Sequence, residues 1–105
     1  MNYKPVIPRE VARRDAAMAI EDCLETAGAD VALDFVNQLE AAYSFIGKNP
    51  AAGSPRWAHD LNLPGLRCWR LKRFPWLVFY LERDDHVDVW RILHAKRDIP
   101  AWMQP

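Results

Sequence analysis

A short, continuously apolar segment, Trp76–Leu81, constrains the fold of this chain more than any other feature. It reads WLVFYL and lacks the strict alternation of a strand with one wet face. A strand that is apolar on both sides belongs in the centre of a sheet whose two faces are covered. We therefore predict that a strand over about Trp76–Arg83 is the middle one of three consecutive antiparallel strands.

The segments on either side predict the other two strands. The first is expected over Leu66–Arg73, which is rich in Arg and Trp, and the third over His86–Ala95, after a tight turn at Asp84 and Asp85. The preceding segment, Asn49–Pro64, holds several Pro and Gly residues and is predicted to be loop.

The N-terminal half predicts a strand followed by two helices. Tyr3–Ile7 contains Pro5, which cannot donate to a ladder, so an edge strand is expected there. Glu10–Ala27 and the segment from Asp30 to Gly47 both show apolar residues at helical spacing. The link at Gly28 is so short that the helices must form an antiparallel hairpin. The predicted order is β-α-α-β-β-β, an α+β fold in which residues 1–105 form a single domain.

A helical hairpin covers only one broad face of such a sheet. We expect the other face to be left partly open, with part of the following aromatic side chains on it: Trp69, Trp76, Phe79, Tyr80 and Trp90. An exposed apolar patch of this kind usually marks a partner site. The alternative for these aromatic residues is a place in the core.

Charge is segregated along the chain, although fourteen basic and fourteen acidic residues cancel overall. The helical hairpin is acidic, whereas the segment from Leu61 to Leu81 has four basic residues and no acidic one. Arg70 and Lys72 should share one face of the first strand of the sheet, because alternate side chains point the same way. This pattern favours a positive surface for an acidic protein segment or for nucleic-acid phosphate. Alternatively, the basic residues solvate a sheet edge and deter aggregation.

Other classes of function find little support in the sequence. Cys23 and Cys68 are expected to be reduced thiols that pack as small hydrophobes in a cytoplasmic protein, with a disulfide between them as the alternative. His59 and His86 have no Cys or carboxylate at metal-ligand spacing, so we expect neither a metal site nor a cofactor. We expect no signal peptide, and no apolar run is long enough to span a membrane.

Three strings taken together resemble the ParE branch of the ParE/RelE toxin superfamily of bacterial type II toxin–antitoxin systems. They are NPAAGSPR, LPGLRCWRLKRFPWLVFY and VDVWRILHAKRDI. The resemblance implies an α+β toxin bound in a hetero-oligomer by a ParD-like antitoxin, with a ribbon-helix-helix part that binds DNA and a tail that folds on the toxin. It also implies inhibition of DNA gyrase as the activity. DNA would be contacted only through the antitoxin.

For the antitoxin-binding surface, the sequence together with this resemblance points to Arg70, Lys72, Tyr80, Trp90 and Arg91. Acidic residues of the antitoxin would pair with the three cations, and an ordering segment would cover the aromatic groups.

The resemblance leaves a second activity open, because RelE-like relatives cleave mRNA on the ribosome. Such cleavage needs a general base, a general acid and a cation for the phosphorane. The residues that would have to supply these groups are Arg70, Lys72, Arg91, His94 and Arg97. Only His94 has an ordinary pKa suited to acid–base work near neutrality, and its alternative role is a strand-end histidine bonded to backbone. The chain ends DIPAWMQP, without the C-terminal Tyr of the nuclease branch. The sequence therefore favours a non-catalytic toxin.

Overall fold

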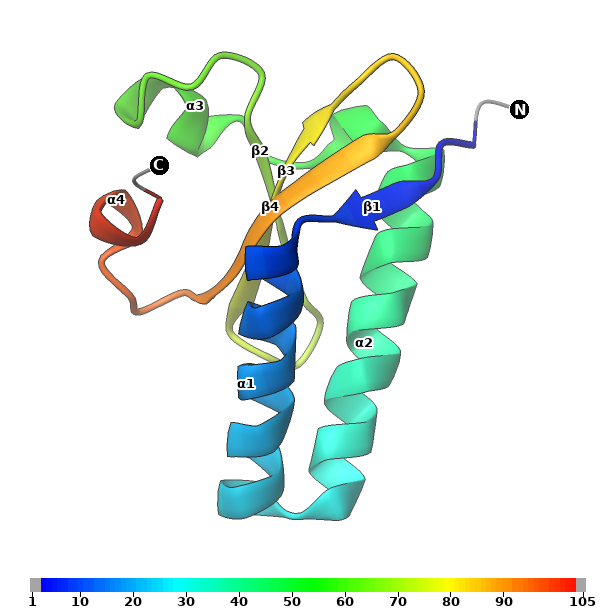
Figure 1. The fold of residues 1–105 in the computed structure, drawn as a ribbon, viewed down its shortest axis with the longest axis vertical. Helices are drawn as coiled ribbons and strands as arrows, with labels where there is room; N and C mark the ends of the chain where they lie inside the picture. The colour runs from blue at the N-terminus through cyan, green and yellow to red at the C-terminus, as the bar shows by residue number, and fades with distance from the viewer. Residues whose placement is uncertain (1–2, 104–105) are drawn as a thin grey trace.

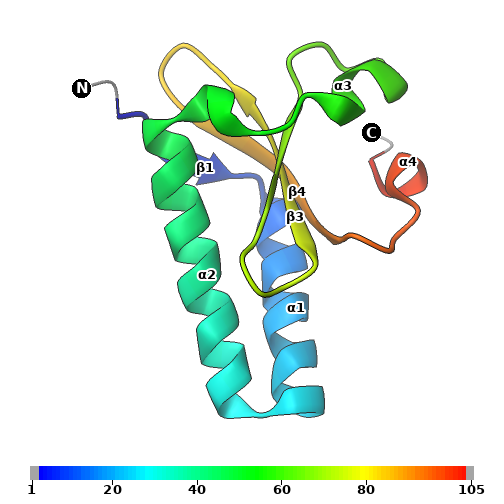
Figure 2. The ribbon, with the colours of Figure 1, turned by 180° about the vertical axis from the view of Figure 1, so that it is seen from behind.

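One mixed sheet of four strands forms the centre of the protein, and helices lie against both of its faces (Figures 1 and 2). The computed structural model describes residues 3–103. Its elements are β1 (Val6–Pro8), α1 (Glu10–Ala27), α2 (Ala29–Lys48), η1 (Pro50–Ala52), α3 (Arg56–Asp60), β2 (Arg67–Arg70), β3 (Trp76–Glu82), β4 (Val87–His94) and α4 (Ile99–Trp102). The predicted β-α-α-β-β-β order and the α+β class are confirmed.

The strands lie in the order β1-β4-β3-β2, so β3 is an interior strand, as its apolar sequence predicted. β2, β3 and β4 pair antiparallel, and β1 joins the edge of β4 in parallel. The N-terminal segment is therefore an edge strand. Phe79 pairs with Arg91 and Tyr80 with Val89, so Trp90 is the extra residue of a β-bulge.

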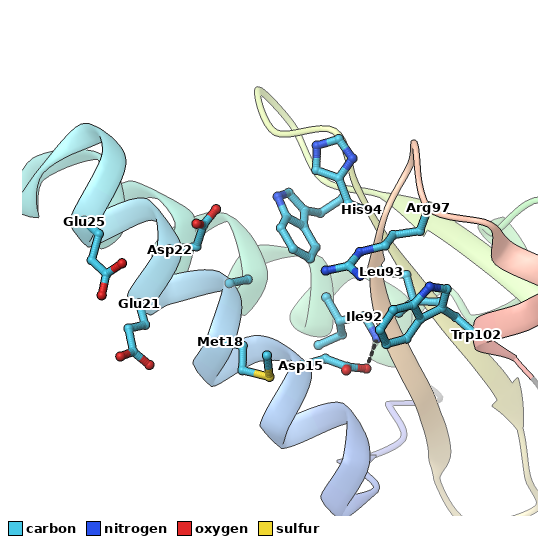
Figure 3. A pocket seen from close by; sticks show the side chains of 12 residues that line it. Asp15, Met18, Glu21, Asp22, Glu25, Ile92, Leu93, His94, Arg97 and Trp102 are labelled. Carbon is cyan, nitrogen blue, oxygen red and sulfur yellow. Dashed lines mark hydrogen bonds between the residues drawn. The ribbon is translucent and has the colours of Figure 1, made fainter.

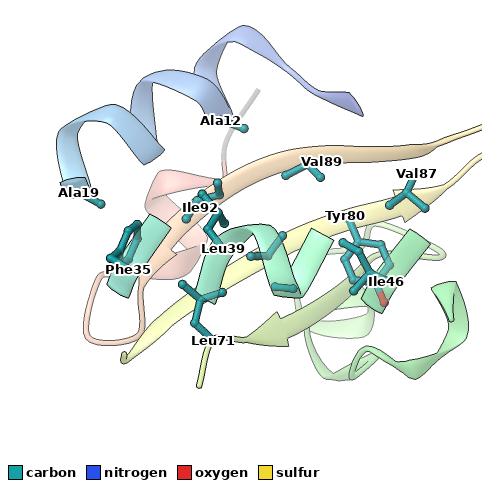
Figure 4. Close-up of a cluster of buried hydrophobic side chains, with 12 residues drawn as sticks. Ala12, Ala19, Phe35, Leu39, Ile46, Leu71, Tyr80, Val87, Val89 and Ile92 are labelled. Carbon is teal, nitrogen blue, oxygen red and sulfur yellow. The ribbon is translucent and has the colours of Figure 1, made fainter. Parts of the chain in front are cut away.

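The two long helices pack as a hairpin on one face of the sheet. Gly28 joins them directly, with the positive φ of 97° that ends α1 and starts α2. The apolar stripe of α2 supplies Phe35 and Ile46, which lie fully buried with Tyr80 and Ile92 of the sheet (Figure 4). This cluster is the larger of the two cores.

The opposite face of the sheet corrects a prediction, because the chain covers much of it. Phe79 is completely buried there in a second apolar cluster, together with Leu66, Leu93, Ile99 and Met103. α3 and the segment around α4 supply this cover. The sequence did not predict it, because one segment looks like an irregular loop and the other contains two prolines. Of the aromatic residues expected on this face, Trp69, Trp76 and Tyr80 pack instead on the helical side.

Two segment boundaries differ from the sequence prediction for local reasons. β2 ends at Arg70 rather than near Arg73, because Arg73 takes a left-handed φ of 66° that no strand continues. The segment after α2 that was predicted to be loop contains η1 and α3. The Tyr80 hydroxyl holds the first residues of this segment in place. That hydroxyl donates to the Pro50 carbonyl at 2.8 Å and accepts from the Gly53 amide at 2.9 Å.

Within residues 3–103, no helix combines the length and the apolar character needed to cross a membrane.

Candidate functional site

A pocket on the face opposite the helical hairpin is the candidate functional site. It lies between β2, α3 and the segment that follows β4, and its volume is about 610 Å³. Three arginines line it, namely Arg56 from α3, Arg70 from the end of β2 and Arg97 from the turn after β4. No carboxylate is among the described residues that line it. We call this site the cationic pocket.

The three arginines are available for a ligand. Within residues 3–103, none of them makes an ion pair. Arg56 lies over the ring of Trp57 at 5.0 Å and Arg97 over that of Trp102 at 4.4 Å, contacts that leave their outward N–H groups free to bind an anion. The pocket therefore concentrates positive charge without an internal partner.

The alternation of β2 brings Arg70 to this pocket. Trp69 turns toward the helical side, where its ring stacks on Phe45 with centroids 4.7 Å apart, and Leu71 is buried in the same core. Arg70 and Cys68 consequently face the pocket, as the strand period requires. Lys72 follows as an exposed residue and makes no ion pair within the described part of the chain.

Arg91 lies outside the cationic pocket, because an ion pair holds it. Its Nε and Nη2 donate to the carboxylate of Asp15 on α1 at 2.8 and 2.9 Å, and its Nη1 donates to the Trp102 carbonyl at 2.7 Å. The hydrogen bond with Asp15 raises the pKa of the Arg91 guanidinium. Its charge is thus already neutralised within the fold.

His94 also lies apart from Arg70. Its Nδ1 accepts from the backbone N–H of Lys96 at 3.1 Å, and its ring meets Trp76 edge-on at 5.2 Å. The residue lines a second groove, on the α1 side of β4, which Arg97 also lines. Of the five residues considered for nuclease chemistry, only Arg70 and Arg97 come together in the cationic pocket.

Tyr80 and Trp90, both expected on the antitoxin-binding surface, are engaged within the protein. Tyr80 is fully buried, so it offers no surface to a partner. Trp90 is half-buried; its Nε1 donates to Asp88 at 3.1 Å, and the guanidinium of Arg9 lies over its ring at 4.3 Å.

Among the described residues, those that line the pocket include cations but no group suited to acid–base chemistry near neutrality. Apart from the arginines, its ionisable lining residue is Cys68, and burial raises the pKa of that thiol to about 12. Both cysteines are free thiols packed among apolar neighbours, as predicted. Among residues 3–103, no group of three His, Cys, Asp or Glu residues is placed to hold a metal ion.

The sequence prediction singled out neither Arg56 of the cationic pocket nor Asp15, which holds Arg91 outside that pocket. Arg56 lies within the string NPAAGSPR, which helped to indicate the family. Its segment was predicted to be loop, so the sequence did not indicate where the Arg56 side chain would lie. Asp15 appeared only as one acid among many on its helix. Asp15 pairs with Arg91 across 76 residues of sequence, so no local residue spacing predicts the pair.

Comparisons with known proteins agree with this fold and identify the family. The family model described as "ParE toxin of type II toxin-antitoxin system, parDE" matches residues 6–99. A solved structure titled "Chromosomal ParDE TA system from P. aeruginosa" is similar in fold, with a TM-score of 0.75 at 18% identity over 91% of this chain and 100% of that one. A comparison with curated protein sequences gives no match. Because the family model spans nearly the whole sequence, the chain belongs to the ParE toxin family of type II toxin–antitoxin systems.

Proposed function

We propose that this toxin acts by binding DNA gyrase, and that a ParD-like antitoxin with a ribbon-helix-helix part neutralises it. The observation that carries the proposal is the composition of the cationic pocket. Arg56, Arg70 and Arg97 offer charge for binding, and no other lining residue within 3–103 offers proton transfer near neutrality. A toxin that binds its target needs only the first property, whereas a nuclease needs both.

The alternative is a RelE-like mRNA endoribonuclease. Arg70 and Arg97 would suit the stabilisation of a phosphorane, which is the feature in its favour. Against it stand the positions of Arg91 and His94, two of the three other residues considered for such an enzyme. Arg91 is paired with Asp15, and His94 lines a different depression of the surface, which Arg97 also lines but Arg70 does not. We therefore place catalysis second.

The proposed antitoxin surface consists of the exposed cations Arg70 and Lys72 together with the rim of the cationic pocket. An acidic segment that orders on this surface would gain charge-assisted hydrogen bonds and would cover the arginines. Neutralisation would then be occlusion of the surface that meets the target, in a cytoplasmic hetero-oligomer whose DNA contacts come from the antitoxin.

Two assays in parallel test the proposal. Purified toxin is titrated into a gyrase supercoiling reaction, and cellular mRNA is mapped by primer extension after the toxin is induced. The proposal predicts inhibited supercoiling and intact mRNA. Discrete mRNA cleavage with unaffected gyrase would establish the nuclease instead. His94→Gln is the control variant, because loss of the imidazole should leave gyrase inhibition unchanged and would abolish cleavage that depends on it.

A further inference from the structure

A second depression of the surface, on the other side of β4, is not used by the function proposed above. It is a groove of about 530 Å³ between α1 and the C-terminal half of β4 (Figure 3). Its floor is apolar and includes Trp76, Ile92 and Leu93. α1 lines one wall with carboxylates, and Arg97 and Trp102, from the segment after β4, line the groove as well. We call it the acidic groove.

The acidic groove contains a stretch of sheet edge that lacks a neighbouring strand. β1 pairs with β4 only as far as Val89, whose carbonyl accepts from the Arg9 amide at 2.9 Å, and the chain then turns into α1. Beyond the bulge at Trp90, the next edge amide that points away from β3 is that of Ile92, and it donates to the Asp15 carboxylate at 3.0 Å. Strand pairing at this edge therefore stops before β4 ends.

Two backbone groups remain at the end of this edge. The Ala95 amide donates to the Pro75 carbonyl, which lies on the β3 side of β4. Because alternate residues of a strand direct their backbone groups to the same side, Leu93 also bonds to β3. Ile92 and His94 direct their backbone groups to the opposite side of β4, away from β3. The His94 carbonyl accepts from the Arg97 amide. Within residues 3–103, the Ile92 carbonyl and the His94 amide have no partner in the fold. One residue of a parallel neighbour can donate to the first and accept from the second.

The wall of the groove indicates the charge of an occupant. Glu21, Asp22 and Glu25 lie along α1, are exposed, and make no ion pair in the described part of the chain. Figure 3 places them across the groove from Ile92 and His94. A Lys or Arg side chain on an added strand would meet these carboxylates, while apolar neighbours would cover the floor.

We propose that the acidic groove binds an extended, basic and apolar segment of the antitoxin, which adds to the edge of β4 as a short parallel strand. The proposal rests on the proposed function, since it takes the antitoxin as the partner. It adds a second anchor of opposite charge to the cationic pocket. The toxin would then bind a tail that carries both an acidic and a basic part, which would increase its specificity for the cognate antitoxin.

The first test compares charge reversals at matched positions in the complete toxin. The probe is the antitoxin encoded by the adjacent gene. Glu21→Lys with Glu25→Lys should raise its dissociation constant by more than about tenfold in titration calorimetry. Glu40→Lys with Asp84→Lys changes the net charge by the same amount at exposed positions outside the groove, and it should leave the constant within about twofold. Equal effects of the two variants would overturn the proposal.

The second test reads strand addition itself, by hydrogen exchange of single amides in the toxin. The His94 amide should exchange rapidly in the free toxin and be protected in the complex. The Val87 amide is the internal control, because it already donates to the Pro5 carbonyl and should change little. A His94 amide that stays unprotected in the complex would overturn the strand, even if affinity depends on the carboxylates. A wild-type toxin that does not bind the antitoxin would instead refute the proposed function.

Discussion

Asp15 and Arg91 form a two-pronged ion pair that joins the first helix to the sheet. Their side chains are only 12% and 17% exposed, and the same carboxylate also accepts from the Ile92 amide. Arg91 in turn donates to the Trp102 carbonyl and so ties down the C-terminal helix. One carboxylate thus connects α1, β4 and α4 at the point where β1 stops pairing.

Replacing Asp15 by Ala should therefore destabilise the protein by about 2–4 kcal/mol, because a largely buried guanidinium and a backbone amide lose their acceptor together. Asp15→Asn should lose less, since the amide oxygen still accepts from Ile92. Urea unfolding measures both. Glu10→Ala is the control, because its pair with Arg14 is exposed and adds little. Equal losses for Asp15→Ala and Glu10→Ala would contradict this role.

Tyr80→Phe should cost about 1–2 kcal/mol of folding free energy, because the Gly53 amide loses its acceptor and the Pro50 carbonyl its donor. Affinity for the antitoxin should not change, since the ring is fully buried. Urea unfolding and titration calorimetry separate the two effects. A loss of affinity for the antitoxin without a loss of stability would show instead that Tyr80 contributes to the binding surface.

Asp88 should make stability sensitive to acid. Burial alone would raise its pKa, but hydrogen bonds from Arg9 and Arg83 outweigh burial and hold the pKa below its ordinary value of 3.8. A lowered pKa in the folded state means that the stabilisation is complete above the ordinary pKa and is lost as pH falls through the folded pKa. Wild type should exceed Asp88→Asn in unfolding free energy at about pH 7, and the difference should shrink below about pH 4. A constant difference would contradict the assignment.

Arg70→Glu with Lys72→Glu should weaken antitoxin binding by at least about tenfold, because both side chains are exposed and lack a carboxylate partner within residues 3–103. Arg13→Glu with Lys48→Glu reverses as much charge at exposed helical positions outside the pocket and should have little effect. Titration calorimetry at two salt concentrations measures both. Arg91 is unsuited to this test, since Arg91→Glu would set a second carboxylate against Asp15.

The fold was predictable where periodicity carries the information. The stripe on α2 that includes Phe35 and Ile46 and the apolar run of β3 each specify an element. The charge pattern singled out Arg70 as a binding residue, and the structure places it in the cationic pocket. The cover of the second face was not predictable, because Ile99 and Met103 lie in a short proline-containing tail without a period.

The site shows the same division. Residue type and strand alternation found Arg70, but whether a cation is free depends on partners far along the chain. Arg91 is neutralised by Asp15 and Arg73 by Asp34, whereas Arg56 makes no ion pair within the part of the chain that the structure describes. Tyr80 was expected on the partly open face of the sheet, and only the structure shows that it is buried, with its hydroxyl bonded to Pro50. Pairing across long sequence separations is tertiary information.

The most direct test of the account is a supercoiling titration with the pocket altered at two points. Arg56→Glu with Arg70→Glu removes two of the three arginines of the cationic pocket and leaves both cores intact. Unfolding must first show that the variant is as stable as wild type. Wild-type toxin should inhibit gyrase, and the folded variant should require a concentration at least about tenfold higher for the same inhibition. Equal inhibition by both proteins would contradict the claim that this pocket carries the toxic activity.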